Sequence, residues 1–290
     1  MDGFDCAAVL LPPEVRSAAE RLPRRVRETC EEFRLRRGSP PTALLAGREE
    51  PLCPRPVDGD MLRGVLASAT RSSLHAAEEE LRNGFLSAPG GVRVGVCGVG
   101  VCGPEGVRGL RDFSSVSIRV PRAVQGCADG IWAALNGGGF QSLLIVSPPG
   151  AGKTTLLREL VRRLSGDGLR VCAADERGEL AGTAGAGFDV GPHTDVMSGV
   201  PKAAAVTMLL RAMNPQVIAM DEIGDEEEAE ALRRAVGCGV TLLASAHGQN
   251  ASDAARRPGS RELLRDGAFR RCVTVSCHDG IRRYRVEELS

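Results

Sequence analysis

Eight consecutive residues combine glycines, a lysine and a hydroxyl group in an order that can hold phosphates. The segment is Ser147-Pro148-Pro149-Gly150-Ala151-Gly152-Lys153-Thr154, and Thr155 follows it. Glycines at 150 and 152 let backbone N–H groups turn inward around a polyphosphate, and Lys153 can reach its terminal phosphates. The Thr154 hydroxyl can hold Mg²⁺. We therefore predict that residues 147–155 bind ATP together with Mg²⁺.

The sequence on either side supplies the elements that such a loop requires. Apolar residues 142–146 predict a buried strand before it, and residues 153–165 predict a helix after it. Ser147 departs from the usual loop pattern, which begins with glycine. We expect the small serine side chain to be tolerated there. The alternative is a glycine-rich turn that holds no ligand.

Two adjacent carboxylates follow a second apolar run. Residues 217–220 (VIAM) predict the end of a buried strand, and Asp221 and Glu222 come directly after it. We predict that Asp221 is the carboxylate on the metal side and that Glu222 orients or deprotonates the attacking water. This pair favours hydrolysis over binding alone. The alternative is a pair of ordinary solvated loop charges.

Further polar residues follow two other predicted strands. His247 comes after 240–245, where a parallel sheet collects its ligands, so we expect it to sense the terminal phosphate. Glu176 and Arg177 follow the strand predicted at 169–174, so Glu176 can support the water shell of the metal and Arg177 can reach a phosphate. A structural histidine and an ordinary charged loop are the alternatives.

Lysine is almost absent from the chain. Of 37 basic side chains only Lys153 and Lys202 are lysines. An ammonium is a compact point charge and a guanidinium is a planar fork, so a lysine retained in such a chain indicates a site where arginine does not serve. Lys202 begins a predicted helix, where a cation opposes the helix dipole. We therefore expect an anion beside Lys202, for example a phosphate across a subunit boundary.

The wider pattern from residue 126 to 290 alternates strands with helices. Predicted strands at 142–146, 169–174, 216–220 and 240–245 are separated by helices at 153–165, 202–213 and 225–236. Such alternation is typical of an α/β fold with a parallel sheet. The loop 178–200 exceeds what a connector needs, so we expect it to have a function or to be mobile. Asp279-Gly280 predicts a terminal hairpin.

Residues 1–125 predict a smaller α+β domain. Helical patterns run from 15 to 35 and from 61 to 81. The glycine-rich segment 90–106 predicts a β-hairpin, and 114–122 predicts an edge strand that Pro121 ends.

Composition excludes some classes of protein. The 37 basic and 37 acidic side chains cancel, and aromatic residues make up 3% of the chain, which leaves few stacking platforms for single-stranded nucleic acid. No apolar run approaches the length of a membrane span, and the first residues lack the basic start of a signal peptide. We expect a cytoplasmic protein with reduced cysteines and without a membrane span.

Taken together, the motifs resemble those of the stage III sporulation protein AA family. The matching stretches are EEFRLRRGSP, NGFLSAPGGVRVGVCG, SSVSIRVPR, SPPGAGKTTLLREL, DERGELAG, HTDVMSGVPK, LLRAMNPQVIAMDEIG and ASAHG. The resemblance implies a RecA-like P-loop ATPase core related to the type II and type IV secretion ATPases. It also implies a homo-oligomeric ring, expected to be a hexamer. The ring would serve a membrane-embedded sporulation channel or secretion complex at the mother-cell face of the forespore membrane. His247 would fall in a histidine box and DERGEL near an acidic box.

Three positions depart from the family pattern: Ser147, His193 in place of an arginine, and Val200 in place of a cysteine. If the missing arginine were a phosphate-contacting finger, catalysis would be weakened. Arg177 and Arg211 are then the candidate replacements. Two other functions stay open, a nucleic-acid-dependent P-loop motor and a nucleotide-gated scaffold with little turnover.

Overall fold

The chain divides into two compact units. In the computed structural model the boundary between them along the chain falls between residues 122 and 123. The sequence-based boundary at 125 and 126 lies three residues further on. The structure describes residues 3–45, 47–70, 78, 80–104, 106–121, 124–182, 187–278 and 281–289. Within these ranges, no helix has both the length and the hydropathy needed to cross a bilayer.

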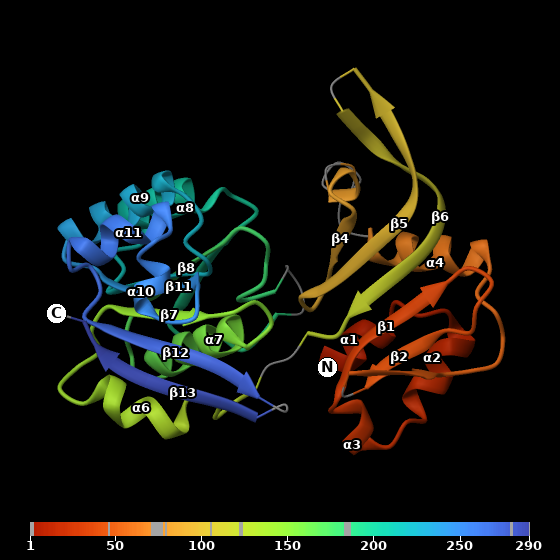
Figure 1. The fold of residues 1–290 in the computed structure, drawn as a ribbon, viewed down its shortest axis with the longest axis horizontal. Helices are drawn as coiled ribbons and strands as arrows, with labels where there is room; N and C mark the ends of the chain where they lie inside the picture. Colours follow the sequence, from red (N-terminus) through yellow and green to blue (C-terminus); the bar gives the residue numbers. More distant parts are fainter. Residues whose placement is uncertain are drawn as a thin grey trace. The chain divides into compact units, whose positions relative to one another are not determined.

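The first unit is an antiparallel sheet with helices packed on it (Figure 1). Its strands have the order β3-β2-β1-β6-β5-β4. The strand bounds are β1 Cys30–Arg36, β2 Thr42–Leu45, β3 Arg48–Pro51, β4 Phe85–Ala88, β5 Val92–Gly103 and β6 Gly106–Arg119. The helices are α1 Gly3–Ala8, α2 Pro13–Glu20, α3 Arg24–Arg27 and α4 Gly59–Ala69. Leu62 and Val65 of α4 are buried in one core with Phe33 of β1 and Ile118 of β6.

Three sequence-based expectations for this unit differ from the structure. The helical pattern predicted from 15 to 35 ends early, because α2 and α3 are separated around Pro23 and a strand begins at Cys30. In that strand Phe33 and Leu35 alternate with more exposed residues, as a half-buried strand requires. The glycine-rich segment is mostly one long strand, β5, and its hairpin partner β6 lies between β1 and β5. The predicted edge strand is therefore central, and Pro121 lies beyond its last residue.

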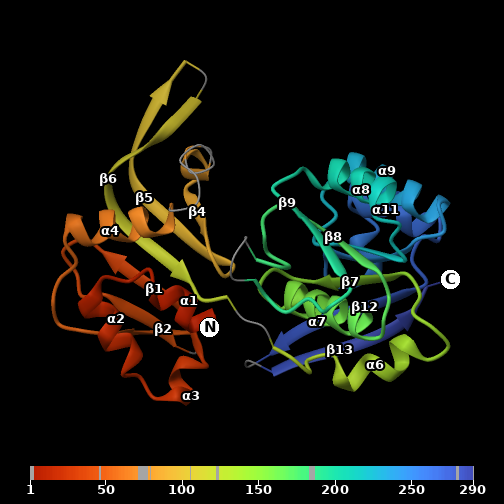
Figure 2. The same ribbon diagram turned by 180° about the vertical axis from the view of Figure 1, so that it is seen from behind.

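The second unit is a seven-stranded sheet with helices on both faces (Figure 2). The strand order is β13-β12-β7-β11-β10-β8-β9. The strand bounds are β7 Leu143–Ser147, β8 Val171–Asp175, β9 Thr194–Ser198, β10 Val217–Met220, β11 Thr241–His247, β12 Arg271–His278 and β13 Ile281–Glu288. The helices are α6 Asp129–Asn136, α7 Lys153–Gly166, α8 Lys202–Ala212, α9 Glu226–Gly237, α10 Ala251–Ala254 and α11 Pro258–Arg265. All neighbouring strands are parallel except the final pair, β12 and β13.

Alternate residues of β7 enter two different cores. Leu143 and Ile145 are buried with apolar side chains of α6 and α7. Leu144 and Val146 are buried with side chains of α8, α9 and α11. A parallel sheet covered on both faces explains why the central strands read as continuous apolar runs.

The predicted loop 178–200 contains a strand that the sequence analysis missed. β9 pairs in parallel with β8 at the edge of the sheet, from Thr194 opposite Val171 to Ser198 opposite Asp175. Its residues are exposed or half-buried, so it lacks the apolar run that marks the other strands. The hairpin predicted around Asp279-Gly280 is formed by β12 and β13, and these two residues lie outside the described part of the chain.

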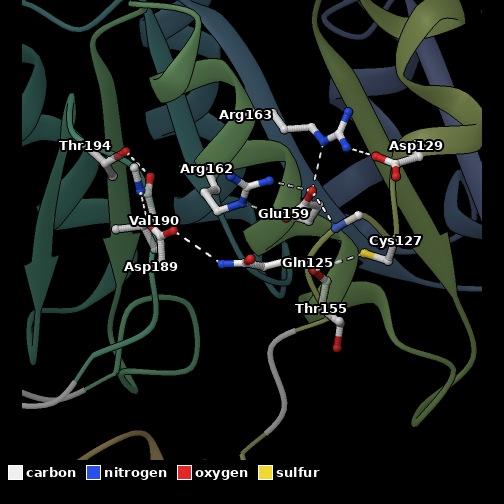
Figure 3. Close-up of polar contacts among 12 residues, drawn as sticks. Gln125, Cys127, Asp129, Thr155, Glu159, Arg162, Arg163, Asp189, Val190 and Thr194 are labelled. Carbon is white, nitrogen blue, oxygen red and sulfur yellow. Dashed lines mark hydrogen bonds and ion pairs between the residues drawn. The ribbon is translucent and has the colours of Figure 1, made fainter. Parts of the chain in front are cut away.

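A buried carboxylate fastens the start of the second unit to α7 (Figure 3). The Glu159 side chain is 3% exposed and accepts hydrogen bonds from the Gly126 N–H, from Arg162 and from Arg163. Arg163 also pairs with Asp129 at the start of α6. Because α7 follows the glycine-rich loop directly, this cluster fixes the helix on which that loop rests.

We predict that Glu159→Ala lowers the free energy of unfolding of the second unit by about 3 kcal/mol, because it leaves two arginines without their buried partner. Urea denaturation followed by tryptophan fluorescence measures this unit alone, since the single tryptophan, Trp132, lies on α6. The matched control is Glu288→Ala, which removes a side chain that is 82% exposed and 3.6 Å from Arg271. It should change stability by less than about 0.5 kcal/mol. Equal effects of the two substitutions would contradict the assignment.

Candidate active site

The glycine-rich segment forms the turn between β7 and α7. Ser147 is the last residue of β7, and Lys153 is the first residue of α7. Gly150 and Gly152 have φ values of 76° and 106°, a left-handed backbone that L side chains rarely adopt. Ser147 is buried, and its hydroxyl donates to the Pro148 carbonyl at 2.8 Å. The serine at the first position is therefore accommodated by a hydrogen bond within the loop.

Strand register brings the other predicted residues to the same edge of the sheet. His247 is paired in register with Ser147 across β11 and β7, and Met220 is paired with Ala244 and Ala174. Residues that follow Met220 and Ala174 therefore emerge beside the glycine-rich loop. Parallel strands align their carboxyl ends, so segments far apart in sequence meet at one site.

Asp221 connects three of these segments. Its Oδ2 accepts a hydrogen bond from Thr154 Oγ1 at 2.7 Å, and its Oδ1 accepts one from Ser245 Oγ at 2.5 Å. The Ser245 hydroxyl in turn accepts the Glu222 N–H at 2.9 Å. Ser245 lies within the apolar run of β11 and was not singled out from the sequence, where it resembles a small core residue.

Glu222 lies between His247 and Lys153. Its Oε1 is 3.1 Å from His247 Nε2, and its Oε2 is 3.9 Å from Lys153 Nζ. Lys153 is 8% exposed. The other imidazole nitrogen of His247, Nδ1, is buried without a hydrogen-bond partner among the described residues. The structure thus brings the predicted base, the loop lysine and the strand-end histidine together.

Lys202 has an anion beside its ammonium, as the sequence predicts. This anion is the Glu228 carboxylate of the same chain, at 2.8 Å. Lys202 Nζ also donates to the backbone carbonyls of Asp221 and Glu222. Sequence reasoning missed this arrangement because Glu228 lies on a different helix, 26 residues further along the chain.

A cavity of about 380 Å³ opens beside Asp221 and Glu222. Glu176, Arg177 and Lys202 also line it. The Glu176 carboxylate accepts the Lys202 N–H at 3.3 Å, so it caps the first turn of α8. Glu176 and Arg177 are both exposed. They lie on the same side of the site as Asp221, within one polar hollow.

Asp175 has a structural part in shaping this hollow. It is 3% exposed and accepts the N–H groups of Leu180 and Ala181 at 3.1 and 2.8 Å. Burial raises the pKa of Asp175. Nearby, Arg158 donates to the Leu180 carbonyl and stacks on the Phe188 ring, and burial lowers the pKa of Arg158 to about 10. These contacts hold the turn that follows Glu176 and Arg177.

Of the two candidate phosphate-contacting arginines, Arg211 lies away from the site of its own chain. Arg211 is exposed in the last turn of α8. It is nine residues from Lys202, and that separation corresponds to roughly 14 Å along a helix. His193 is exposed just before β9, where its backbone pairs with Val171. Val200 packs on the core that contains α8 and α9.

An arginine of the terminal hairpin contacts the glycine-rich loop. Arg282 of β13 donates from Nε to the Ala151 carbonyl at 3.1 Å. A Cβ at Gly152 would lie 2.6 Å from the same Nε atom, so glycine leaves room for this side chain. Nothing in the local sequence indicated this contact, because it depends on how β13 folds back along β12, the strand that pairs with β7.

The oxygen donors at Thr154 and Asp221 suit a magnesium ion. Mg²⁺ prefers hydroxyl, carboxylate and water oxygens, and it is usually held by one or two carboxylates together with substrate phosphates. The hydroxyl and the carboxylate lie 2.7 Å apart at the end of the glycine-rich loop. The residues present therefore fit the ion.

Comparison with solved structures identifies the fold. The ATPase DotB of Yersinia pseudotuberculosis has a TM-score of 0.66 at 15% sequence identity, with 96% of this chain and 80% of that chain covered. The pilus retraction motor PilT, solved with bound ADP, has a TM-score of 0.61 at 17% identity, with 92% and 81% covered. The second unit has the RecA-like fold of these proteins, with a mixed sheet in which parallel strands predominate.

Comparison of sequences identifies the family. Stage III sporulation protein AA of Bacillus subtilis is 34% identical over 286 residues, which cover 93% of this chain and 90% of that protein. The family model described as "Sporulation stage III, protein AA" matches residues 10–284. The chain therefore belongs to the sporulation stage III protein AA family.

Proposed function

We propose that this protein is a Mg²⁺-dependent ATPase. The observation that carries the proposal is the meeting of Lys153, Glu222 and His247 at the end of a glycine-rich loop, with Asp221 hydrogen-bonded to Thr154. The fold it shares with the ATPase DotB supports the same reaction class. Residues 147–155 would hold the phosphates of ATP, with backbone N–H groups and the α7 N-terminus facing them.

In the proposed reaction a water molecule attacks the γ-phosphorus of ATP. A bond forms from the water oxygen to that phosphorus, the bond to the β-phosphate oxygen breaks, and the water proton passes to the Glu222 carboxylate. The products are ADP and inorganic phosphate. His247 Nε2, 3.1 Å from Glu222, orients this carboxylate. The γ-phosphate replaces Glu222 as the partner of the Lys153 ammonium. The Glu222 carboxylate is then available to accept the proton.

Thr154 and Asp221 would hold Mg²⁺, with Glu176 supporting its water shell. When bound, the ion would neutralise charge on the phosphate oxygens. Asp221 stays positioned by Ser245 throughout, because the Ser245 hydroxyl bonds its other oxygen.

We further propose that the active form is a homo-oligomeric ring, a hexamer, with sites at subunit boundaries. Arg211 lies away from the site of its own chain, so it is available to contact the phosphates of a neighbouring subunit, and Arg177 is the second candidate. Such arginines stabilise the charge that develops in the transition state. Domains at 1–125 and 126–290 would move relative to each other during the nucleotide cycle.

Family membership supports a role in sporulation. We propose that the ATPase energises or assembles a channel or secretion-like complex between mother cell and forespore, as a cytoplasmic protein peripheral to the forespore membrane. The alternatives are a nucleic-acid-dependent motor and a nucleotide-gated scaffold with little turnover. Turnover that depends on single-stranded nucleic acid would favour the motor, and ATP binding without turnover would favour the scaffold.

Lys153→Ala should weaken ATP binding roughly 10- to 100-fold, because the phosphates lose a charged hydrogen-bond donor. Isothermal titration calorimetry with ATP and Mg²⁺ measures the change, and circular dichroism controls for folding. Unchanged affinity in folded protein would remove the glycine-rich loop as the phosphate site.

Glu222→Gln should retain ATP binding but lower kcat by roughly 10²- to 10⁴-fold, because the amide cannot accept the proton of the water. Glu226→Gln, an exposed position in the first turn of α9, is the matched control. Phosphate release and calorimetry separate chemistry from binding. A kcat within about threefold of wild type would reassign the base, with Glu176 next.

A mixture of Arg211→Ala and Lys153→Ala subunits should regain activity that neither variant has alone. At some boundaries the intact Lys153 of the first variant would meet the intact Arg211 of the second, which completes a site. Turnover is measured across mixing ratios, with light scattering to follow assembly. A monomer with full ATPase activity would contradict shared sites.

A further inference from the structure

Glu222 has a backbone conformation that needs support. Its φ is 56°, in the left-handed region, and Asp112 and Asn214 are the other non-glycine residues with positive φ in the described part of the chain. Such a conformation is unfavourable for a residue with a side chain and persists only where surrounding contacts hold it. The conformation decides where the Glu222 side chain leaves the end of β10. Contacts to its main chain therefore bear on the position of the carboxylate.

Both peptide groups of this residue are held by side chains. The Glu222 N–H donates to Ser245 Oγ at 2.9 Å, and the Glu222 carbonyl accepts from Lys202 Nζ. Lys202 also reaches the Asp221 carbonyl, at 3.4 Å. Lys202 thus donates hydrogen bonds to the backbone oxygens of Asp221 and Glu222, the two residues that the proposed reaction uses.

Glu228 completes the clamp from the other side. Its Oε1 is 2.8 Å from Lys202 Nζ, and its Oε2 accepts the Gly224 N–H at 2.7 Å. The side chains of Lys202 and Glu228 are 17% and 11% exposed. Asp225, which caps α9, accepts the Glu228 N–H and so fixes the glutamate itself. Side-chain hydrogen bonds therefore hold the backbone of the turn 221–225 at residues 221, 222 and 224.

The geometry explains why lysine is retained here. Two carbonyl oxygens and one carboxylate oxygen converge on the single atom Nζ, and an ammonium offers three donors from one point. A guanidinium spreads its donors over a planar fork and cannot place three of them at one position. In a chain with only two lysines, both meet at Glu222: Lys153 at its carboxylate and Lys202 at its main chain.

We propose that Lys202 is a positioning residue for ATP hydrolysis, acting with Glu228 to hold the Glu222 main chain so that its carboxylate faces His247 and the attacking water. The inference rests on the proposed function of Glu222 as the base. Residues 147–155 would hold the phosphates, and Lys202 would make no contact with them. Its loss should therefore affect the chemical step while leaving the glycine-rich loop able to bind ATP.

The test compares Lys202→Met and Lys202→Arg with Met208→Ala, a change on the same helix at a side chain that is 49% exposed. Misplacement of a catalytic group by about 1 Å can cost roughly 10²-fold in rate, so both Lys202 variants should lose about that factor in kcat. The affinity for a fluorescent ATP analogue should stay within about threefold of wild type. The control should match wild type in both measurements.

Hydrogen exchange in nucleotide-free protein gives a readout that does not depend on turnover. Peptides that cover residues 217–228 should exchange faster in Lys202→Met, because the hydrogen bonds to the Glu222 and Gly224 amides loosen with the clamp. Glu228→Gln, which keeps the shape and removes the charge, serves if Lys202→Met does not fold. It should show the same kcat loss at preserved ATP affinity.

Three results would overturn the inference. They are a Lys202→Arg enzyme with kcat within about threefold of wild type, equal losses of kcat and ATP affinity in Lys202→Met, or unchanged exchange at 217–228. These failures are distinguishable from failure of the proposed function. Wild-type protein that binds ATP without turning it over would overturn the proposed reaction, whereas normal turnover in the variants overturns only the role of Lys202.

Discussion

The bridge made by the Asp221 carboxylate is the interaction on which the site depends. One oxygen accepts a hydrogen bond from Thr154 at the start of α7 and the other accepts one from Ser245 within β11, so a single side chain joins the end of β10 to a helix and to a second strand. The parallel register of β7, β11 and β10 makes this possible, because it brings the ends of these strands to one edge. Packing of α7 against the sheet and the Glu159 cluster behind it keep the loop in place.

The only two lysines of the chain both lie beside carboxylates of the site. Lys153 faces the Glu222 carboxylate, and Lys202 faces its backbone carbonyl and Glu228. Each ammonium occupies a point where acceptors converge, which a planar guanidinium cannot satisfy in the same way. The geometry thus explains why lysine is retained at these two positions. The partners of Lys202 could not be predicted from the sequence.

Elements that depend on local residue patterns could be predicted from the sequence. Apolar runs predicted β7, β8, β10 and β11, and the rule that ligands collect at the carboxyl ends of parallel strands predicted a role at the site for His247. Prediction failed where contacts depend on the path of the chain in space. Ser245 resembled a core filler, Arg282 arrives from a distant hairpin, and the exposed strand β9 has no apolar signal. The helix predicted through residue 35 overlooked the alternation in β1.

The most direct test of the account is ATP turnover by purified wild-type protein, measured with its mass in solution. The assay is run with and without Mg²⁺ and with and without single-stranded nucleic acid. The protein should hydrolyse ATP only with Mg²⁺, faster as oligomers form, and at the same rate with or without nucleic acid. Absence of turnover at every protein concentration, or turnover only with nucleic acid present, would contradict the account.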